Sequence, residues 1–440
     1  MMWTALDTWI VVAAVLAGAT CAMIGSFLVL KKVSMMGDAI SHAVLPGIAV
    51  AFIITGSRSG PAMLIGAAVV GVLTAVLVHV IHHYSRLEEG ASMGVVFTVL
   101  FAIGLILIER AAHHVDIHPE HVLFGAVELV PLHLISVFGF GVPRGVILLA
   151  FVLLINLSVV TLLFKELRLA TFDPELATTL GINATMIHYL LMVLVAMTTV
   201  AAFEVVGSIL VIAMLIVPGA TAWLLTRRLL PFLIVSVAVS VVAAVLGHIA
   251  AITVPPLFGY VDTSTAGSMA TVLGILFFGA LLFAPEQGVV ARAIDALRLR
   301  LSIGSQDALG LLARAAENTE SQTGSLSAAE LRGVHRSPFA GHRLKLAAIL
   351  AFLRVKGSVV FRGGRYHTTE RGSEQGREIL RSHRLWEQFF FDDGKVRISE
   401  LHPAADVLEH YTNNDLREDL SERFAGKRTD PQGRPIPGED

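Results

Sequence analysis

Two ionisable residues lie inside an apolar stretch near the N-terminus, within the sequence GDAISHAVLPG at residues 37–47. Asp38 and His42 are four residues apart, so a helix places both side chains on one face. Ionisable side chains at membrane depth are costly and usually face a pathway or a partner. A carboxylate beside an imidazole is a ligand pair that manganese, iron and zinc all accept. The alternative is a structural role, with Asp38 at the cytoplasmic end of the helix and His42 hydrogen-bonded to a backbone carbonyl.

A third ionisable group, Glu204, ends another apolar stretch and precedes the sequence VVGSILVIAMLIVPGATA. It is a candidate for the same pathway, and equally for an interfacial carboxylate that faces water. His188 and His248 are single histidines in apolar stretches, and we interpret them as hydrogen-bonded structural groups. The histidine- and acid-rich segment 113–121 we interpret as a solvated loop.

The C-terminal part of the chain holds a second group of metal-ligand side chains, in the sequences HRLWE and HPAADVLEH. His383 and Glu387 are four residues apart on one helical face. The second sequence forms a stripe at i, i+4, i+7 and i+8, made of His402, Asp406, Glu409 and His410. Nitrogen and oxygen ligands without cysteine suit manganese or iron better than a structural zinc site. The alternative is a solvated, charged stripe on a soluble domain.

The composition divides the chain into two parts. Residues 1–284 hold 10 Lys or Arg and 13 Asp or Glu, about 8% of that part, whereas residues 285–440 hold 23 and 22, about 29%. The first part has the composition of a membrane protein and the second that of a soluble domain. This excludes a single soluble enzyme and a disordered or fibrous chain. The one cysteine, Cys21, excludes a disulfide framework and cysteine-based zinc sites.

Nine apolar segments are long enough to cross a membrane, since a spanning helix needs roughly 20 apolar residues. We predict spans at about 8–30, 33–55, 61–84, 92–109, 145–164, 184–203, 205–225, 230–252 and 266–284. The second contains Asp38, His42 and Pro46, so the number of spans is eight or nine. Lys and Arg in the connecting loops number seven on the side of Lys31 and three on the other. The positive-inside rule then places the N-terminus outside and the C-terminal domain in the cytoplasm.

Residues 165–183 (KELRLATFDPELATTLGIN), on the inner side, are too polar to span and indicate one short amphipathic helix between turns. Asp173 followed by Pro174 is typical of an N-cap and a first helical position, and Gly181 is typical of a helix end. Residues 110–144, on the outer side, also do not span.

After residue 285 the chain continues as a charged helix and a polar linker, to about 325. Short helices and the strand–turn–strand GSVVFRGGRYHTT follow, with Gly363-Gly364 at the turn, an order that describes a winged helix. Helical segments at 372–392 and from 402 to about 425 come next, with Pro403 in the first turn of the second.

The predicted domains are a transmembrane domain (1–285), a helix and linker (286–325) and a winged-helix and metal-binding domain (326–440), whose first helix could begin near 306. The predicted fold is an all-α polytopic membrane protein followed by a small cytoplasmic α+β winged-helix domain with a helical metal-binding region.

Three segments of the membrane half, LVLKKVSMMGDAISHAVLPGIA, DPELATTLGI and VGSILVIAMLIVPGATA, resemble the permease subunits of bacterial manganese/zinc/iron ABC importers. The resemblance covers about residues 8–284 and implies a metal pathway through Asp38 and His42. It implies a coupling helix that docks on the ATPase, involving Asp173, Pro174, Glu175 and Gly181. It also implies three partners: an ABC ATPase subunit, an extracytoplasmic metal-binding protein and a second permease subunit, identical or paralogous. No cofactor is implied for the membrane domain.

The segments TTERGSEQGREILRSHRLWEQF, HPAADVLEH and DPQGRPIP resemble metal-dependent repressors of the iron- and manganese-responsive type, over about residues 306–437. In that family a winged helix precedes a dimerisation region that holds the metal. The resemblance implies that Mn²⁺, or Fe²⁺ or Zn²⁺, is held here by His383, Glu387, His402, Asp406, Glu409 and His410. Asp307 is a weaker candidate in the first helix. The chain departs from the family at the recognition helix, whose middle is apolar, so DNA is a less favoured partner.

No Gly-x-x-x-x-Gly-Lys-[Ser/Thr] loop occurs in the chain, so we predict that it is not an enzyme and that a partner hydrolyses ATP. We predict a multi-pass permease subunit of the cell membrane that imports manganese, in preference to zinc or iron, with a fused metal-sensing domain. The alternative is a metal-dependent transcriptional regulator released from the permease by proteolysis near 315–325. A secondary transporter driven by an ion gradient is disfavoured by the coupling-type segment.

Overall fold

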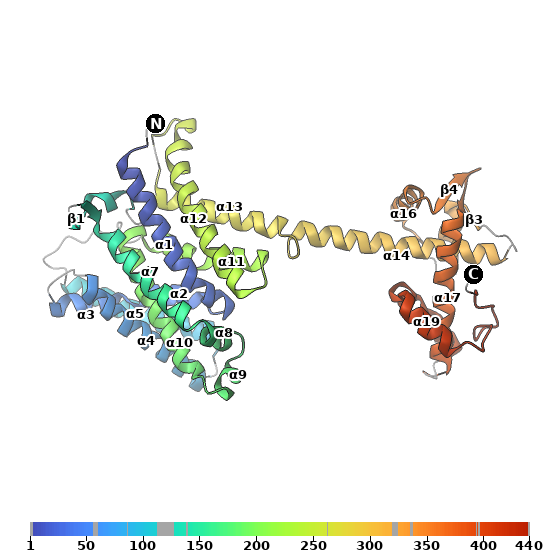
Figure 1. Cartoon of the computed structure of the whole chain (residues 1–440), viewed down its shortest axis with the longest axis horizontal. Coiled ribbons are helices and arrows are strands. Elements are labelled where there is room, and N and C mark those ends of the chain that lie inside the picture. The colour runs from blue at the N-terminus through green and yellow to red at the C-terminus, as the bar shows by residue number, and fades with distance from the viewer. Residues whose placement is uncertain are drawn as a thin grey trace. The chain divides into compact units, whose positions relative to one another are not determined.

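The computed structural model describes residues 3–438, apart from 56–59, 86, 112–126, 138–139, 262, 319–323, 335–337, 393 and 395–396. It divides into two compact units, Met1–Ala291 and Arg292–Asp440, which are described separately (Figure 1). The histidine-rich segment 113–121 lies outside the described residues.

The first unit is a bundle of apolar helices. Nine candidate membrane spans are present among its described residues, which confirms the predicted polytopic fold. Apolar length alone specifies these helices, because a backbone in lipid must satisfy its hydrogen bonds within the segment. They are α1 (Ala5–Leu30), α2 (Ser34–Ala43) with α3 (Leu45–Thr55), α4 (Gly60–Ser85), α5 (Glu89–Ala111), α7 (Arg144–Leu162), α10 (Ala184–Val206), α11 (Ser208–Leu225), α12 (Leu229–Thr253) and α13 (Thr265–Phe283).

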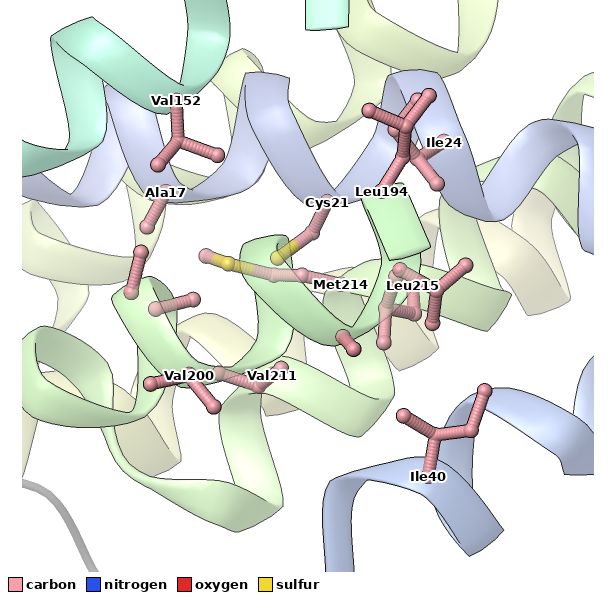
Figure 2. Packing of buried hydrophobic residues seen from close by; sticks show 14 of the residues in the cluster. Ala17, Cys21, Ile24, Ile40, Val152, Leu194, Val200, Val211, Met214 and Leu215 are labelled. Carbon is pink, nitrogen blue, oxygen red and sulfur yellow. The ribbon is translucent and has the colours of Figure 1, made fainter. Parts of the chain in front are cut away.

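Helix α1 lies at the centre of this bundle and packs against α7, α10, α11 and α12. Figure 2 shows Cys21 of α1 and Met214 of α11 among the aliphatic side chains of this core. The close approach of α1 to α11 depends on Gly25, because a Cβ there would lie 1.9 Å from the carbonyl oxygen of Leu215. Small residues at such crossings let membrane helices pack by van der Waals contact.

The second span is interrupted. Helix α2 ends at Ala43, directly after His42, and α3 begins at Leu45 with Pro46 in its first turn. Proline fits that position because it has no backbone N–H to donate. Both short helices pack against α5.

Two groups of short elements connect the spans at opposite ends of α7. The 3₁₀ helix η2 (Val127–Leu132) and the hairpin β1 (Leu134–Val137) with β2 (Phe140–Pro143) precede α7, and α8 (Phe164–Phe172) and α9 (Pro174–Thr179) follow it. The short helix predicted between Asp173 and Gly181 is confirmed as α9, but α8, which ends just before Asp173, was not predicted. Pro174 disfavours helical backbone in the preceding residue, and Asp173 accordingly has φ −147°. The 3₁₀ helix η3 (Pro255–Phe258) follows α12.

The second unit begins with α14 (Val289–Asn318), continues through β3 (Ser325–Leu326), α15 (Ala328–Gly333) and α16 (Arg343–Val355), and reaches β4 (Val359–Arg362) and β5 (Arg365–Thr368). The antiparallel sheet has the order β3-β5-β4. Gly363 and Gly364 form the β4–β5 turn with φ of 56° and 77°, which confirms the predicted hairpin. Leu309 and Leu312 of α14 join Leu346 and Ile349 of α16 in one apolar core.

The remaining helices are α17 (Glu370–Asp392), α18 (Ile398–Leu408), the 3₁₀ turn η4 (Glu409–Tyr411) and α19 (Asn414–Arg423). The prediction of one helix from 402 to about 425 is wrong, because Asn413 caps a new helix by accepting the N–H of Leu416 at 2.9 Å. Pro403 lies inside α18 and not in its first turn. The helix starts earlier than predicted because the fully buried Leu401 belongs to its apolar face.

Candidate metal sites and coupling segment

The Asp38–His42 pair lies near the end of α2. His42 Nε2 is 3.4 Å from Asp38 Oδ1, with 29% and 48% of the respective side chains exposed. The rings of Phe97 and Phe101, on α5, flank the imidazole at centroid distances of 6.0 and 5.7 Å. The pair therefore lies at the interruption of a membrane helix, where transporters commonly place ion sites, and both side chains remain accessible to a ligand.

Glu204 forms an ion pair with an arginine at a helix end. Glu204 lies in the last turn of α10, and its Oε1 is 3.9 Å from Nε of Arg144, the first residue of α7. Gly207, with φ of 81°, makes the sharp turn into α11. His248 is buried with a ring nitrogen 3.3 Å from Asp7 Oδ1, which agrees with a structural role.

The residues of the predicted coupling segment lie together around α9. Asp173 Oδ1 accepts the N–H of Leu176 at 2.9 Å, and Pro174 occupies the first helical position. Gly181 ends the segment with φ of 84°, a conformation that glycine adopts without strain. The side chains of Leu176 and Leu180 are exposed. Exposed apolar groups on a short rigid helix are typical of a docking surface, and sequence patterning alone did not single out these two leucines.

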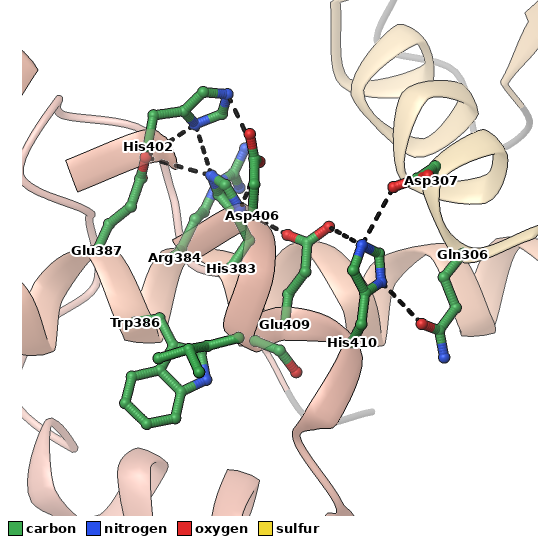
Figure 3. A network of polar contacts seen from close by, with 12 residues as sticks. Gln306, Asp307, His383, Arg384, Trp386, Glu387, His402, Asp406, Glu409 and His410 are labelled. Carbon is green, nitrogen blue, oxygen red and sulfur yellow. Dashed lines mark hydrogen bonds and ion pairs between the residues drawn. The ribbon is translucent and has the colours of Figure 1, made fainter. Parts of the chain in front are cut away.

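The six predicted C-terminal ligands come together in the second unit, around His383 (Figure 3). His383 Nε2 lies 2.7 Å from His402 Nδ1 and 3.2 Å from Glu387 Oε1, and the same carboxylate oxygen lies 3.1 Å from His402 Nδ1. His383 and Glu387 point from α17, and His402 from α18. These three ligands form the first candidate metal site.

A second group of ligands lies beside the first. His410 Nε2 is 3.1 Å from Asp307 Oδ1 and 3.8 Å from Glu409 Oε1, so the weak candidate on α14 does reach this cluster. Glu409 also places Oε2 at 2.5 Å from His383 Nδ1, and Asp406 Oδ1 is 3.4 Å from the same nitrogen. Glu409 therefore connects the two groups.

Hydrogen bonds within the cluster shift the pKa values of its members. Burial acts to lower the pKa of His383, but Glu387 and Glu409 outweigh it and the pKa is raised. Burial acts to raise the pKa of Glu387, but His383 and His402 lower it to about 2. Burial acts to lower the pKa of His410, but the hydrogen bond and charge of Asp307 outweigh it and the pKa is raised. The cluster thus combines ionised carboxylates with basic imidazoles, which must lose their protons when a metal binds.

The donor set of the first group fits a divalent metal ion. At metal–ligand bonds of about 2.1 Å, adjacent ligand atoms in an octahedral site lie about 3 Å apart. The separations of 2.7 to 3.2 Å among the three ligand atoms match that spacing. His383 Nε2 and His402 Nδ1 also lie 2.7 Å from each other, so only one of them can carry a proton there and the other presents a lone pair that an ion can take. His383, Glu387 and His402 would hold the metal, with Asp307, Glu409 and His410 as the second set.

Several residues that support this cluster had no signal in the sequence patterning. Gln306 Oε1 is 2.8 Å from His410 Nδ1 and fixes that ring. Arg384, only 2% exposed, donates to both carboxylate oxygens of Glu317 at 2.9 and 2.6 Å and to the carbonyl of Pro435. The arginine thereby ties the C-terminal tail to α14 and α17. Arg384 directly follows the ligand His383 in the sequence, but only the structure shows that it is buried.

Comparison with known proteins agrees with both halves of this description. Residues 369–438 match the family model described as "Iron dependent repressor, metal binding and dimerisation domain". The "Manganese transport system membrane protein MntD" of Bacillus subtilis is 42% identical over 67% of this chain and 97% of its own. The "Zinc transport system membrane protein TroD" of Treponema pallidum is 34% identical over 67% of this chain and 78% of its own.

A solved structure, "PsaBC from Streptococcus pneumoniae in complex with Fab", has a chain that is 31% identical to this one, with a TM-score of 0.54 over 64% of this chain and 94% of that chain. Residues 5–284 match the model of the ABC 3 transport family, which covers every candidate span, the Asp38–His42 pair and the α9 segment. The chain therefore belongs to the ABC 3 transport family.

Proposed function

We propose that this chain is the permease subunit of an ATP-driven importer of divalent transition metal, with manganese as the substrate and zinc or iron as competitors. The observation that carries the proposal is an Asp38–His42 ligand pair at an interrupted span of an ABC 3 family bundle. The relatives named for manganese and zinc transport support the substrate class.

The metal passes Asp38 and His42 during translocation. Both can offer a ligand atom to a partly dehydrated cation, and the aromatic walls formed by Phe97 and Phe101 limit water around it. Glu204 contributes farther along, near Arg144, where its carboxylate attracts cations at the end of α10.

The membrane orientation is N-terminus outside and C-terminal domain in the cytoplasm. The end of α1 that carries Lys31 also carries α8, since Lys31 Nζ donates to the carbonyl of Ala170 at 3.0 Å. That end holds most loop Lys and Arg, as expected for a cytoplasmic face. Helix α9 therefore lies on the side where ATP is hydrolysed.

The partners are an ABC ATPase subunit, an extracytoplasmic metal-binding protein and a second permease subunit. The ATPase docks on the α9 segment through Asp173, Pro174, Glu175 and Gly181, with the exposed Leu176 and Leu180 as apolar contacts. The ATPase supplies the energy, because this chain has no phosphate-binding loop.

The second unit senses cytoplasmic Mn²⁺, or Fe²⁺ or Zn²⁺, and inhibits import when it is loaded. Its ligand geometry supports metal binding, and the functional boundaries are 1–285 for the permease, 286–325 for the connecting helix and linker, and 326–440 for the sensor with its first helix from about 306. Inhibition requires that the metal bind the inhibiting arrangement better than the permissive one. The second candidate function is a transcriptional regulator released by proteolysis near 315–325, which the match of residues 369–438 to the metal-binding domain of iron-dependent repressors favours.

The test is uptake by proteoliposomes that contain the full chain, the ATPase encoded with it and the external binding protein. We expect radioactive manganese to accumulate only when ATP is present on the side of the membrane where the ATPase lies. Zinc and iron should compete with manganese for uptake. Uptake without any ATPase would contradict the proposal and favour a gradient-driven carrier. Immunoblotting for a C-terminal fragment in cells distinguishes the released regulator from the fused sensor, because a stable fragment is expected only if the domain is released.

A further inference from the structure

Helix α16 exposes an apolar face. Its buried side, formed by Leu346, Ile349, Leu350 and Leu353, packs into the core of the second unit. The opposite side carries Leu344 and Val355, each 88% exposed. Between them the same exposed stripe, at 100° per residue, is continued by Ala347, Ala348 and Ala351. Single exposed apolar residues are ordinary, but a stripe along a whole helix calls for an apolar environment.

Basic residues border this stripe on both sides. On the helical wheel, Arg343 and Arg354 fall on one edge of the stripe, and Lys345 falls on the other, followed by Lys356 at the helix end. The whole segment 338–368 contains six Lys or Arg and no Asp or Glu. The rest of the second unit, 292–337 and 369–440, contains 17 Lys or Arg and 21 Asp or Glu. The face is therefore apolar at its centre and positive at its edges.

The β4–β5 hairpin extends the same face. Phe361 is 48% exposed, and the guanidinium of Arg354 lies 6.0 Å from the centre of its ring. Arg362 follows it at the turn. Arg365, in contrast, is engaged by Glu330 at 2.6 Å and does not add free charge.

This pattern fits a lipid surface better than a duplex. Reading base edges in the major groove requires hydrogen-bonding side chains along the inserted helix, whereas the centre of this face holds leucine, alanine and valine. A helix that lies in a bilayer interface has an apolar face with Lys and Arg along its edges, whose stems extend to the headgroups. Anionic lipids complement the charge. The nine spans of the first unit also keep the bilayer within reach at high effective concentration.

We propose that α16 and the β4–β5 hairpin dock on the anionic surface of the membrane that holds the same chain. The membrane is bound by the α16 face: Leu344, Ala347, Ala348, Ala351 and Val355 enter the headgroup–acyl boundary, and Arg343, Lys345, Arg354 and Lys356 contact lipid phosphates. This goes beyond metal transport and sensing and does not depend on either.

The test uses the full chain in nanodiscs of phosphatidylcholine, with or without phosphatidylglycerol. A nitroxide is attached at Leu344→Cys in a Cys21→Ala background, and its collisions with oxygen and with a nickel chelate are measured by electron paramagnetic resonance. We expect the label to be accessible to oxygen and shielded from nickel only in discs with phosphatidylglycerol. A label at Val407→Cys is the control, because Val407 is apolar and 59% exposed but lies on α18. It should stay accessible to nickel in both discs.

Charge variants sharpen the test. The triple variant Arg343→Gln, Lys345→Gln, Arg354→Gln should weaken docking on the order of 100-fold, since each charge near an anionic surface contributes about fivefold. The charge-preserving triple Arg343→Lys, Lys345→Arg, Arg354→Lys should retain it. High salt should detach the α16 face of the parent chain from the lipid surface. Circular dichroism and manganese uptake check that each variant is folded.

Three outcomes would overturn the proposal. One is a label at residue 344 that is equally accessible to nickel with and without phosphatidylglycerol. Another is dipolar broadening between labels that does not depend on lipid composition, which would assign the face to a second copy of the chain. The third is shielding of the label by duplex DNA in phosphatidylcholine discs but not by phosphatidylglycerol, which would assign it to nucleic acid.

Discussion

Asp38 and His42 contact each other because they are one helical turn apart. Both side chains stay partly exposed because α2 ends directly after His42. As the proposed pathway ligands, they suit a transient binding site. Two ligands with partial exposure bind a cation weakly enough to release it, whereas the buried C-terminal cluster offers more ligands around one point. The same residue types can therefore serve transport in one unit and sensing in the other.

Replacing the pathway ligands should stop transport without preventing assembly. We expect Asp38→Asn and His42→Ala each to reduce initial manganese uptake by about tenfold or more, since losing 1.4 kcal/mol of binding is a factor of ten. Glu204→Gln should reduce uptake less, because Arg144 already neutralises that carboxylate. Uptake is measured in cells, and copurification of the ATPase serves as the control for assembly. Normal uptake by both variants would remove Asp38 and His42 from the pathway.

Glu409 is shared between the two ligand groups, so its loss should differ from that of its neighbours. We expect His402→Ala to abolish metal binding at the first group only, and Glu409→Ala to weaken both. Metal content of the purified full chain after equilibrium dialysis against manganese measures this. His367→Gln, which changes a histidine of β5 outside the cluster, should bind like the parent. Equal stoichiometry in His402→Ala and the parent would contradict the assignment.

At the scale of elements, helix boundaries depend on local chemistry that sequence carries only in part. The apolar spans could be predicted because length in a membrane specifies them. The start of α9 at Asp173 could also be predicted, from a capping residue followed by proline, but α8 and the early start of α18 could not, since the burial of Leu401 depends on tertiary packing. The i, i+4 ligand pairs could be predicted from helix geometry, but the contact of Asp307 with His410 joins different elements and depends on tertiary packing.

The α9 segment should transmit ATPase motion through its exposed apolar face. We expect Leu176→Ala with Leu180→Ala to weaken copurification of the ATPase and to lower uptake. Gly181→Ala should uncouple ATP hydrolysis from uptake, because a positive φ strains a residue with a Cβ by about 1 kcal/mol. Met186→Ala, which removes another exposed apolar side chain, on α10, is the matched control. If hydrolysis and uptake both stay normal in the α9 variants, the segment is only a connector.

The crossing of α1 and α11 should tolerate no side chain at Gly25. A Cβ there meets the carbonyl oxygen of Leu215 at 1.9 Å, whereas one at Gly94 meets nothing within 4 Å. We expect Gly25→Ala to destabilise the folded chain by about 1–3 kcal/mol, as overpacking does, and Gly94→Ala to leave it unchanged. The midpoint of thermal unfolding in detergent compares the two. Similar midpoints would show that α1 and α11 adjust without cost.

At the scale of the whole molecule, the chain combines two units. The membrane unit holds the partly exposed Asp38–His42 pair, and the second unit holds a cluster of histidines and carboxylates around the buried His383. One polypeptide thereby contains both the path for a metal and a site suited to bind it. If the second unit inhibits import as proposed, import responds directly to the metal that it delivers, provided that loading changes the equilibrium between two states of the permease.

That response should appear as a difference between high and low metal. We expect the full-length triple variant His402→Ala, Glu409→Ala, His410→Ala to accumulate more manganese than the parent at high external concentration and to match it at low concentration. Occupied ligands are needed for inhibition, and a tenfold preference of the metal for the inhibiting state, about 1.4 kcal/mol, is enough to shift a balanced equilibrium. Deleting the residues after about 305 should have the same effect. His367→Gln should behave like the parent at both concentrations. A triple variant that accumulates manganese like the parent would show that the second unit does not control the import.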